Sequence, residues 1–130
     1  MKLYENNAFF WQKMDTLFLS SELSVTRVKG DRHPLYNNLI YPVDYYHLRN
    51  TSGNSETGKI CVYKGSASSN RVDAIIVAVD ILKKDMDAKL LNGCTPAEEE
   101  AVLRFLNQTD FQKTILVRRG SDIPNWAVTE

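Results

Sequence analysis

The apolar run at positions 74–79, Ala-Ile-Ile-Val-Ala-Val, constrains the fold more than any other feature of this chain. Charged residues stand on both sides of it, at Arg71 and Asp80. A short continuous apolar run between such ends is typical of a strand that is buried on both faces. The run therefore predicts a strand in the middle of a sheet.

Two helices are expected at opposite ends of this strand region. Residues 6–19 repeat large apolar side chains at helical spacing, which predicts an amphipathic helix. We expect its apolar stripe to pack on the domain's own core, with a subunit interface as the alternative. Later, Thr95, Pro96 and Glu98 form a capping box with proline at the first helical position, which predicts the start of a second helix.

Further strands are expected at residues 21–28, 39–48, 60–63 and 113–119, from alternation or from β-branched and aromatic content. Pro42 cannot donate a ladder hydrogen bond, so the second of these is expected at an edge or interrupted. The order helix, strands, helix, strand favours an α+β fold over a doubly wound sheet. Residues 120–130 are expected to form an irregular tail.

Composition sets limits on organisation and partners. A chain of 130 residues, 43% hydrophobic and 25% charged, is expected to form one domain over residues 1–130. Its 16 basic and 16 acidic residues give a net charge of zero and therefore no overall electrostatic field that would attract nucleic acid or an anionic membrane. This argues against both as partners. No apolar stretch approaches the roughly 20 residues of a membrane span, and no signal peptide is evident. We therefore expect a cytoplasmic protein with reduced thiols at Cys61 and Cys94.

The motifs of P-loops, Rossmann dinucleotide sites, zincins and esterase elbows are absent from the sequence. What remains is a set of residues of the kinds that a magnesium-assisted phosphate site uses. They are cations (Lys29, Arg32, Lys89), phenols (Tyr41, Tyr45, Tyr46) and carboxylates (Glu56, Asp80, Asp85, Asp87). The plainer interpretation of residues 85–89 is a solvated turn that closes the buried strand, and that of Cys61 is a small core residue.

Four segments, in order, carry a resemblance to a known family. They are Lys-Gly-Asp-Arg-His-Pro at 29–34, Tyr-Pro-Val-Asp-Tyr at 41–45, Thr-Ser-Gly at 51–53, and residues 79–89 with Asp-Met-Asp-Ala-Lys at the end. In this order they resemble the soluble (family I) inorganic pyrophosphatases, particularly the short bacterial members. The resemblance spans roughly residues 23–119.

The resemblance implies a small, highly twisted, OB-like β-barrel of about five to seven strands over residues 22–119, flanked by the two helices. It implies Mg²⁺-dependent hydrolysis of diphosphate to phosphate, and it suggests a homo-oligomer. Asp85, Asp87 and Tyr45 would be catalytic. Substrate would be held by Lys29, Arg32, Tyr45 and Lys89, and the metal by Glu56, Asp80, Asp85 and Asp87.

One segment departs from the family's pattern. The family's metal loop reads D-x-D-P-x-D, whereas here two of those positions fall on Asn54 and Cys61, and Glu56 is the acid retained in either register. An amide and a thiol are poorer Mg²⁺ ligands than carboxylates. Two interpretations remain: an altered phosphohydrolase acting on diphosphate or a phosphorylated small molecule, or a non-catalytic phosphate-binding or assembly module on the same fold. A single-strand binder that uses Tyr41, Tyr45, Tyr46 and Tyr63 lacks the expected basic excess.

Overall fold

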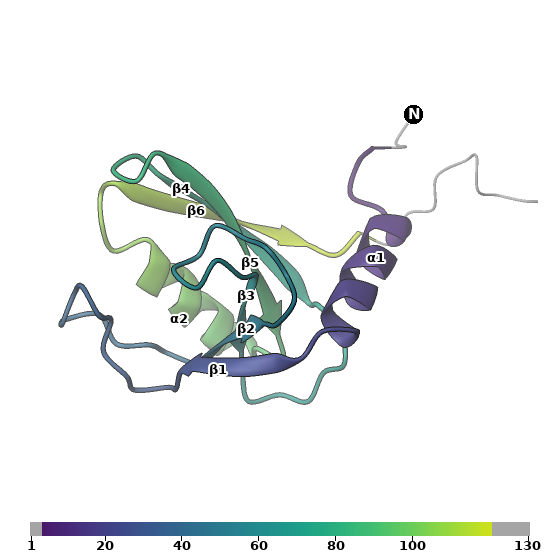
Figure 1. The fold of residues 1–130 in the computed structure, drawn as a ribbon, viewed down its shortest axis with the longest axis horizontal. Helices are drawn as coiled ribbons and strands as arrows, with labels where there is room; N and C mark the ends of the chain where they lie inside the picture. The colour runs from purple at the N-terminus through teal and green to yellow at the C-terminus, as the bar shows by residue number, and fades with distance from the viewer. Residues whose placement is uncertain (1–3, 121–130) are drawn as a thin grey trace, which may run out of the picture.

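The computed structural model describes residues 4–120 (Figure 1). In chain order the elements are α1 (Ala8–Leu19), β1 (Leu23–Arg27), β2 (Asp44–Leu48), β3 (Cys61–Lys64), β4 (Ala74–Asp80), β5 (Asp85–Asn92), α2 (Pro96–Leu106) and β6 (Gln112–Arg118). Both predicted helices are present, and the expected α+β class is confirmed. All but one residue of the predicted tail lie outside the described residues.

The six strands form one mixed sheet in the order β1-β2-β3-β5-β4-β6. All neighbours are antiparallel except β3 and β5, which run parallel. The number of strands agrees with the expected range, but the sheet is not closed into the expected barrel. Within residues 4–120, β1 and β6 are the two edges of the sheet and do not pair with each other.

The predicted central strand is β4, which pairs with β5 on one side and β6 on the other. Ile76, near its middle, is fully buried. The segment after it differs from the expectation. Residues 85–92 form strand β5 rather than a solvated turn, and the turn covers only the residues between Asp80 and Asp85, which face each other in the β4–β5 pair.

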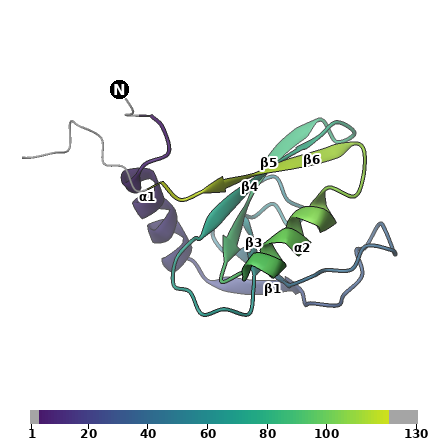
Figure 2. The ribbon, with the colours of Figure 1, turned by 180° about the vertical axis from the view of Figure 1, so that it is seen from behind.

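Each face of the sheet carries its own hydrophobic cluster and its own helix. On one face, Val102 and Phe105 of α2 pack with Tyr63, Ile76 and other residues of the strands. On the other face, Trp11 and Phe18 of α1 pack with Val62, Ile75 and Leu90. Figure 2 shows α2 lying across the sheet, while α1 stands at one end of it. The apolar stripe of α1 therefore packs on the domain's own core, as expected.

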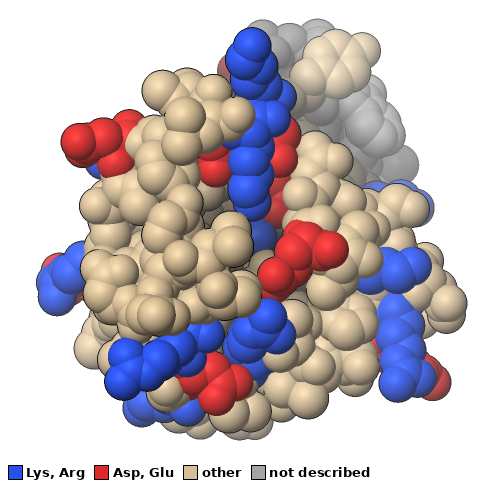
Figure 3. All heavy atoms as spheres, turned by 60° about the vertical axis from the view of Figure 1, so that its left-hand side comes forward, with Lys and Arg blue, Asp and Glu red and all other residues tan. Residues whose placement is uncertain are grey.

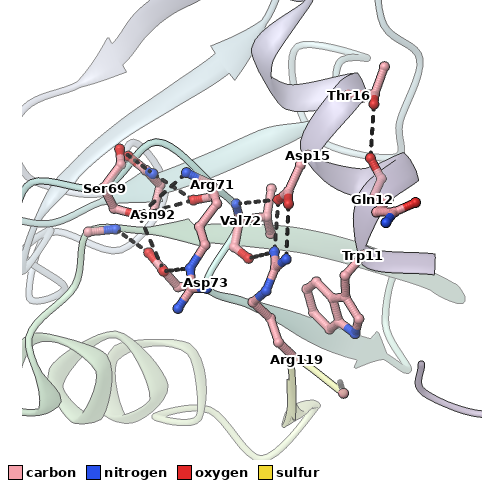
Figure 4. Close-up of polar contacts among 12 residues, drawn as sticks. Trp11, Gln12, Asp15, Thr16, Ser69, Arg71, Val72, Asp73, Asn92 and Arg119 are labelled. Carbon is pink, nitrogen blue, oxygen red and sulfur yellow. Dashed lines mark hydrogen bonds and ion pairs between the residues drawn. The ribbon is translucent and has the colours of Figure 1, made fainter. Parts of the chain in front are cut away.

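A polar network fixes α1 to the sheet (Figure 4). The Asp15 carboxylate accepts hydrogen bonds from both terminal nitrogens of Arg119, at 2.8 and 2.9 Å, and from the Val72 backbone N–H at 3.0 Å. Arg119 also donates to the Val72 carbonyl at 2.7 Å and lies 5.2 Å from the Trp11 ring. This network joins α1 to two chain segments that are distant from it in sequence.

The second helix begins as the sequence predicts. The Thr95 hydroxyl accepts from the Glu98 backbone N–H at 3.2 Å, and the Glu98 carboxylate accepts from the Thr95 N–H at 2.9 Å. Glu98 also accepts from the Ser66 N–H, which ties the helix start to the loop after β3. The cap thus positions α2 over its face of the sheet, with Phe105 and Leu106 directed into the core.

Candidate functional site

A cleft with a cavity of about 350 Å³ opens on the α2 face of the sheet. Its walls come from the loop between β1 and β2, the loop before β3, the adjoining ends of β4 and β5, and the segment from α2 to β6. Figure 3 turns this side of the molecule forward and shows acidic and basic side chains gathered around a hollow in the surface. The cleft therefore lies at the end of the sheet away from α1.

Strand β5 supplies the charged floor of the cleft through its alternation. Asp85, Asp87 and Lys89 line the cleft, whereas Met86 and Ala88 between them are exposed on the other side. Successive side chains of a strand point to opposite faces, so every second residue shares one face. The parallel β3–β5 pairing places Lys89 opposite Cys61 and beside Tyr63, which also lines the cleft.

Lys89 is the most constrained charged group of the cleft. Its Nζ lies 3.0 Å from Oδ2 of Asp87 and donates to the Tyr45 hydroxyl at 3.1 Å. The Lys89 and Asp87 side chains are only 12% and 15% exposed. Charge-assisted hydrogen bonds of this length are among the strong ones, so the ammonium is held in place rather than free to swing.

Protonation in this cluster follows from burial and neighbouring groups. Burial lowers the pKa of Lys89, but the Tyr63 phenol and the Asp87 carboxylate raise it more, so the net shift is upward. Burial and the nearby Cys61 thiol raise the pKa of Tyr45 far above its usual value. At neutral pH, Lys89 is therefore a cation and Tyr45 a neutral phenol. Both can stabilise an anion, and neither is suited to act as a base.

The remaining carboxylates of the cleft are arranged differently. Asp80 is 5% exposed, and one of its oxygens accepts from the backbone N–H groups of Leu82 and Lys83, each at 2.9 Å. Glu56 lies 4.0 Å from the Arg27 guanidinium and is exposed. Asp80 thus fixes the turn and offers its second oxygen, whereas Glu56 stands at the rim.

Of the eight residues to which the resemblance gives a role, six line this one cleft: Tyr45, Glu56, Asp80, Asp85, Asp87 and Lys89. Lys29 and Arg32 are not among the lining residues. The backbone of Arg32 forms a bridge with Ile40, and its guanidinium donates to the Asn37 carbonyl at 2.9 Å. Lys29 and Arg32 therefore lie outside the lining of the cleft, and the Arg32 side chain contacts its own loop.

Two other residues considered in the sequence analysis do not line the cleft. Cys61 is 1% exposed in the α2-side core, in agreement with its interpretation as a small core residue. Tyr46 packs against the cluster on the opposite face. By contrast, Lys83 lines the cleft, although no role was expected for it. Its position after the apolar run resembles an ordinary charged turn, so no sequence signal marks it.

The acids of the cleft bear on whether it can hold Mg²⁺. Among residues 4–120, no group of three or more His, Cys, Asp or Glu side chains is placed to hold a metal ion. The cleft nevertheless offers only hard oxygen donors among its acids, with Glu56, Asp85 and Asp87 at its rim and floor. Mg²⁺ is commonly held by one or two carboxylates together with water and phosphate oxygens. The described residues therefore form no metal site by themselves, and one or two of these carboxylates are the most that they could give to an Mg²⁺ ion brought in by an anionic ligand.

Comparison with protein-family models gives no match, and neither does comparison with curated proteins. The helices in the described part of the chain are too short or too polar to cross a membrane.

Proposed function

We propose that the chain is a pyrophosphatase-like phosphohydrolase that binds diphosphate together with Mg²⁺ in the cleft and hydrolyses its phosphoanhydride bond. The observation that carries this proposal is the placement of Lys89, which Asp87 and Tyr45 hold on the floor of a cleft that also contains Asp85 and Glu56. A fixed cation beside carboxylates that can share a divalent ion is the arrangement that phosphoryl transfer requires.

In this proposal each residue of the cleft has a stated role. Lys89 and Tyr45 donate hydrogen bonds to phosphate oxygens, and Lys83 adds positive charge at the rim. One or two of the cleft carboxylates, such as Asp85 and Asp87 of β5, would hold the ion together with phosphate oxygens. When bound, Mg²⁺ neutralises phosphate charge and lowers the pKa of a coordinated water. Water adds to one phosphorus, the bridging P–O bond breaks, and two phosphates leave with release of a proton.

A second candidate is a non-catalytic module that binds a phosphorylated anion in the same cleft. It is favoured by the amide at Asn54, which lines the cleft and donates to the Met86 carbonyl at 2.7 Å, where the related family carries an acid. The burial of Cys61 removes another of those acid positions from the cleft. Fewer carboxylates weaken a resident metal site, while binding through Lys89 and Tyr45 stays intact.

Phosphate release from diphosphate distinguishes the two. We expect release that requires Mg²⁺, stops with a chelator and returns when the metal is added back. Asp87→Ala and Lys89→Ala should each slow release at least ~100-fold, because loss of a preorganised charge contact typically costs ~3 kcal/mol. Lys13→Ala, on an exposed position of α1, is the matched control for loss of a cation. Binding of diphosphate without metal-dependent release would establish the module instead.

A further inference from the structure

The cleft is lined by aromatic side chains as well as by charged ones. Opposite the charged floor, the lining consists largely of rings from the β1–β2 loop and from the α2–β6 segment: His33, Tyr36, Tyr41, Phe105 and Phe111. These two chain segments do not contribute acids to the cleft. One continuous cavity is therefore lined by charged side chains and by aromatic side chains.

The rings form a connected wall. His33 is stacked parallel to Tyr41, with centroids 6.1 Å apart and planes at 4°. Tyr36 lies 5.2 Å from His33 and 6.2 Å from Phe111 at tilted angles. Tyr41 and Phe105 are buried beneath, whereas His33, Tyr36 and Phe111 are half-exposed. The outer rings thus present surface to the cavity in addition to packing on one another.

His33 belongs to this wall as an uncharged ring. Burial is the main reason that its pKa is lowered, and Glu56 opposes the shift only in part. Its Nδ1 accepts from the Leu35 backbone N–H at 3.1 Å, so the neutral ring carries its proton on Nε2. The wall therefore adds a planar surface and one hydrogen-bond donor, with no charge of its own at neutral pH.

The volume of the cavity agrees with a ligand larger than diphosphate. About 350 Å³ is within the range of roughly 300–1,000 Å³ that holds drug-sized ligands. At about 30 Å³ each, some dozen waters would fill it. Two phosphoryl groups at Lys89 would occupy only part of that space and would leave the aromatic part to water, which gains little from contact with ring faces.

We propose that the natural ligand of the cleft is a diphosphate ester with a planar ring, of the nucleoside diphosphate class. Its phosphates lie at Lys89 and Tyr45, and its ring lies against Tyr36 and Phe111. This inference rests on the proposed function for the phosphate half and adds the identity of the organic half. In the reaction, water adds to the terminal phosphorus, the bridging P–O bond breaks, and a nucleoside monophosphate, phosphate and a proton are released.

The test is calorimetric titration of the full chain, with Mg²⁺ present, by three ligands: ADP, methyl diphosphate and inorganic diphosphate. Methyl diphosphate carries the ester without a ring and so separates stacking from charge. Base–aromatic stacking is worth about 1–3 kcal/mol, which is about 5- to 150-fold in affinity. We expect ADP to bind at least ~10-fold more tightly than methyl diphosphate.

Variants of the wall identify the source of that difference. Tyr36→Ala should remove most of the preference for ADP and leave methyl diphosphate affinity within about twofold, whereas Tyr36→Phe, the matched control, should keep the preference because it keeps the ring. Phe111→Leu provides a second loss of ring surface that preserves apolar volume, should Tyr36→Ala not fold.

The outcomes separate this inference from the proposed function. Equal affinity for ADP and methyl diphosphate, with metal-dependent phosphate release from diphosphate, overturns the inference and leaves the proposed function standing. Binding of ADP that Tyr36→Ala weakens supports the inference even if turnover is absent. Failure of all three ligands to bind overturns both.

Discussion

The ion pair between Asp87 and Lys89 provides a test of whether these residues serve the cleft or the fold. Both side chains are more than four-fifths buried and lie 3.0 Å apart, with Tyr45 as a third partner. Breaking such a pair by removing one member leaves an uncompensated charge, which costs about 3–5 kcal/mol when burial is complete. Here the cleft admits water, so we expect about 2–3 kcal/mol for Lys89→Met and about 1–2 kcal/mol for Asp87→Asn.

The double variant Asp87→Asn, Lys89→Met should behave differently. Replacement of a buried pair by uncharged residues of similar size is often neutral or stabilising. We therefore expect its free energy of unfolding to lie within about 1 kcal/mol of the parent, which requires a coupling energy of at least about 2 kcal/mol between the two sites. Its phosphate release should nevertheless be as low as that of the worse single variant, because the fixed ammonium is gone.

Urea unfolding of the parent, the two single variants and the double variant at neutral pH measures this double-mutant cycle directly. For a domain of this size, about 1 kcal/mol corresponds to about 3–5 °C in Tm, so thermal unfolding gives an independent check. The reasoning is refuted if the double variant loses as much stability as the two single variants together. That result would mean that the two side chains stabilise the fold independently, with no energetic coupling between them.

Two further predictions concern positions away from the charged floor. Burial raises the pKa of Asp15, but its bonds to Arg119 and Val72 lower it by more, so the net pKa lies below the ordinary 3.8. The stabilisation that the Asp15 carboxylate gives to the fold is therefore complete above pH 3.8 and is lost as the pH falls through the folded pKa. Asp15→Asn should thus unfold with about 1–2 kcal/mol less free energy at pH 7, and denaturant titrations should show this difference shrinking below about pH 4, whereas a constant difference would contradict the assignment. Cys61→Ala should cost about 1 kcal/mol of stability and leave the phosphate-release rate within about twofold, whereas a large loss of rate would mean that the thiol takes part in the chemistry.

Much of the fold is readable from local signals. The capping box at Thr95 and the apolar run of β4 predict their elements because each signal is contained within a few residues. The error at β5 is instructive, since residues 85–89 do alternate. One face of β5 carries Asp85, Asp87 and Lys89, and the other carries Met86 and Ala88. Charged side chains on a strand usually indicate a face exposed to solvent, whereas here that face forms the floor of a cleft.

The composition of the cleft was only partly predictable, for a physical reason. Its acids and Lys89 occur in short motifs, so the sequence alone brings them to attention. The aromatic wall joins Tyr36 to Phe111, which are far apart in the chain and meet only after the sheet has formed. Arg32 shows the converse: its motif marks it as a phosphate ligand, yet the bridge to Ile40 and the bond to Asn37 engage it elsewhere.

The balance of charge in the cleft bears on both candidate functions. Four carboxylates and only two ammonium groups line it, and one of those ammonium groups already neutralises Asp87. A phosphate oxygen about 6 Å from an unpaired carboxylate meets a repulsion of about 3 kcal/mol at an effective dielectric constant near 20. Among the described residues, Asp80 and Asp85 are the cleft carboxylates without an ion pair. Their repulsion would weaken the binding of an unaccompanied diphosphate to Lys89 and Lys83. If the proposed anion binds here, we therefore expect a divalent cation to strengthen its binding, whether or not the anhydride is then hydrolysed, and titration of diphosphate with and without Mg²⁺ measures this.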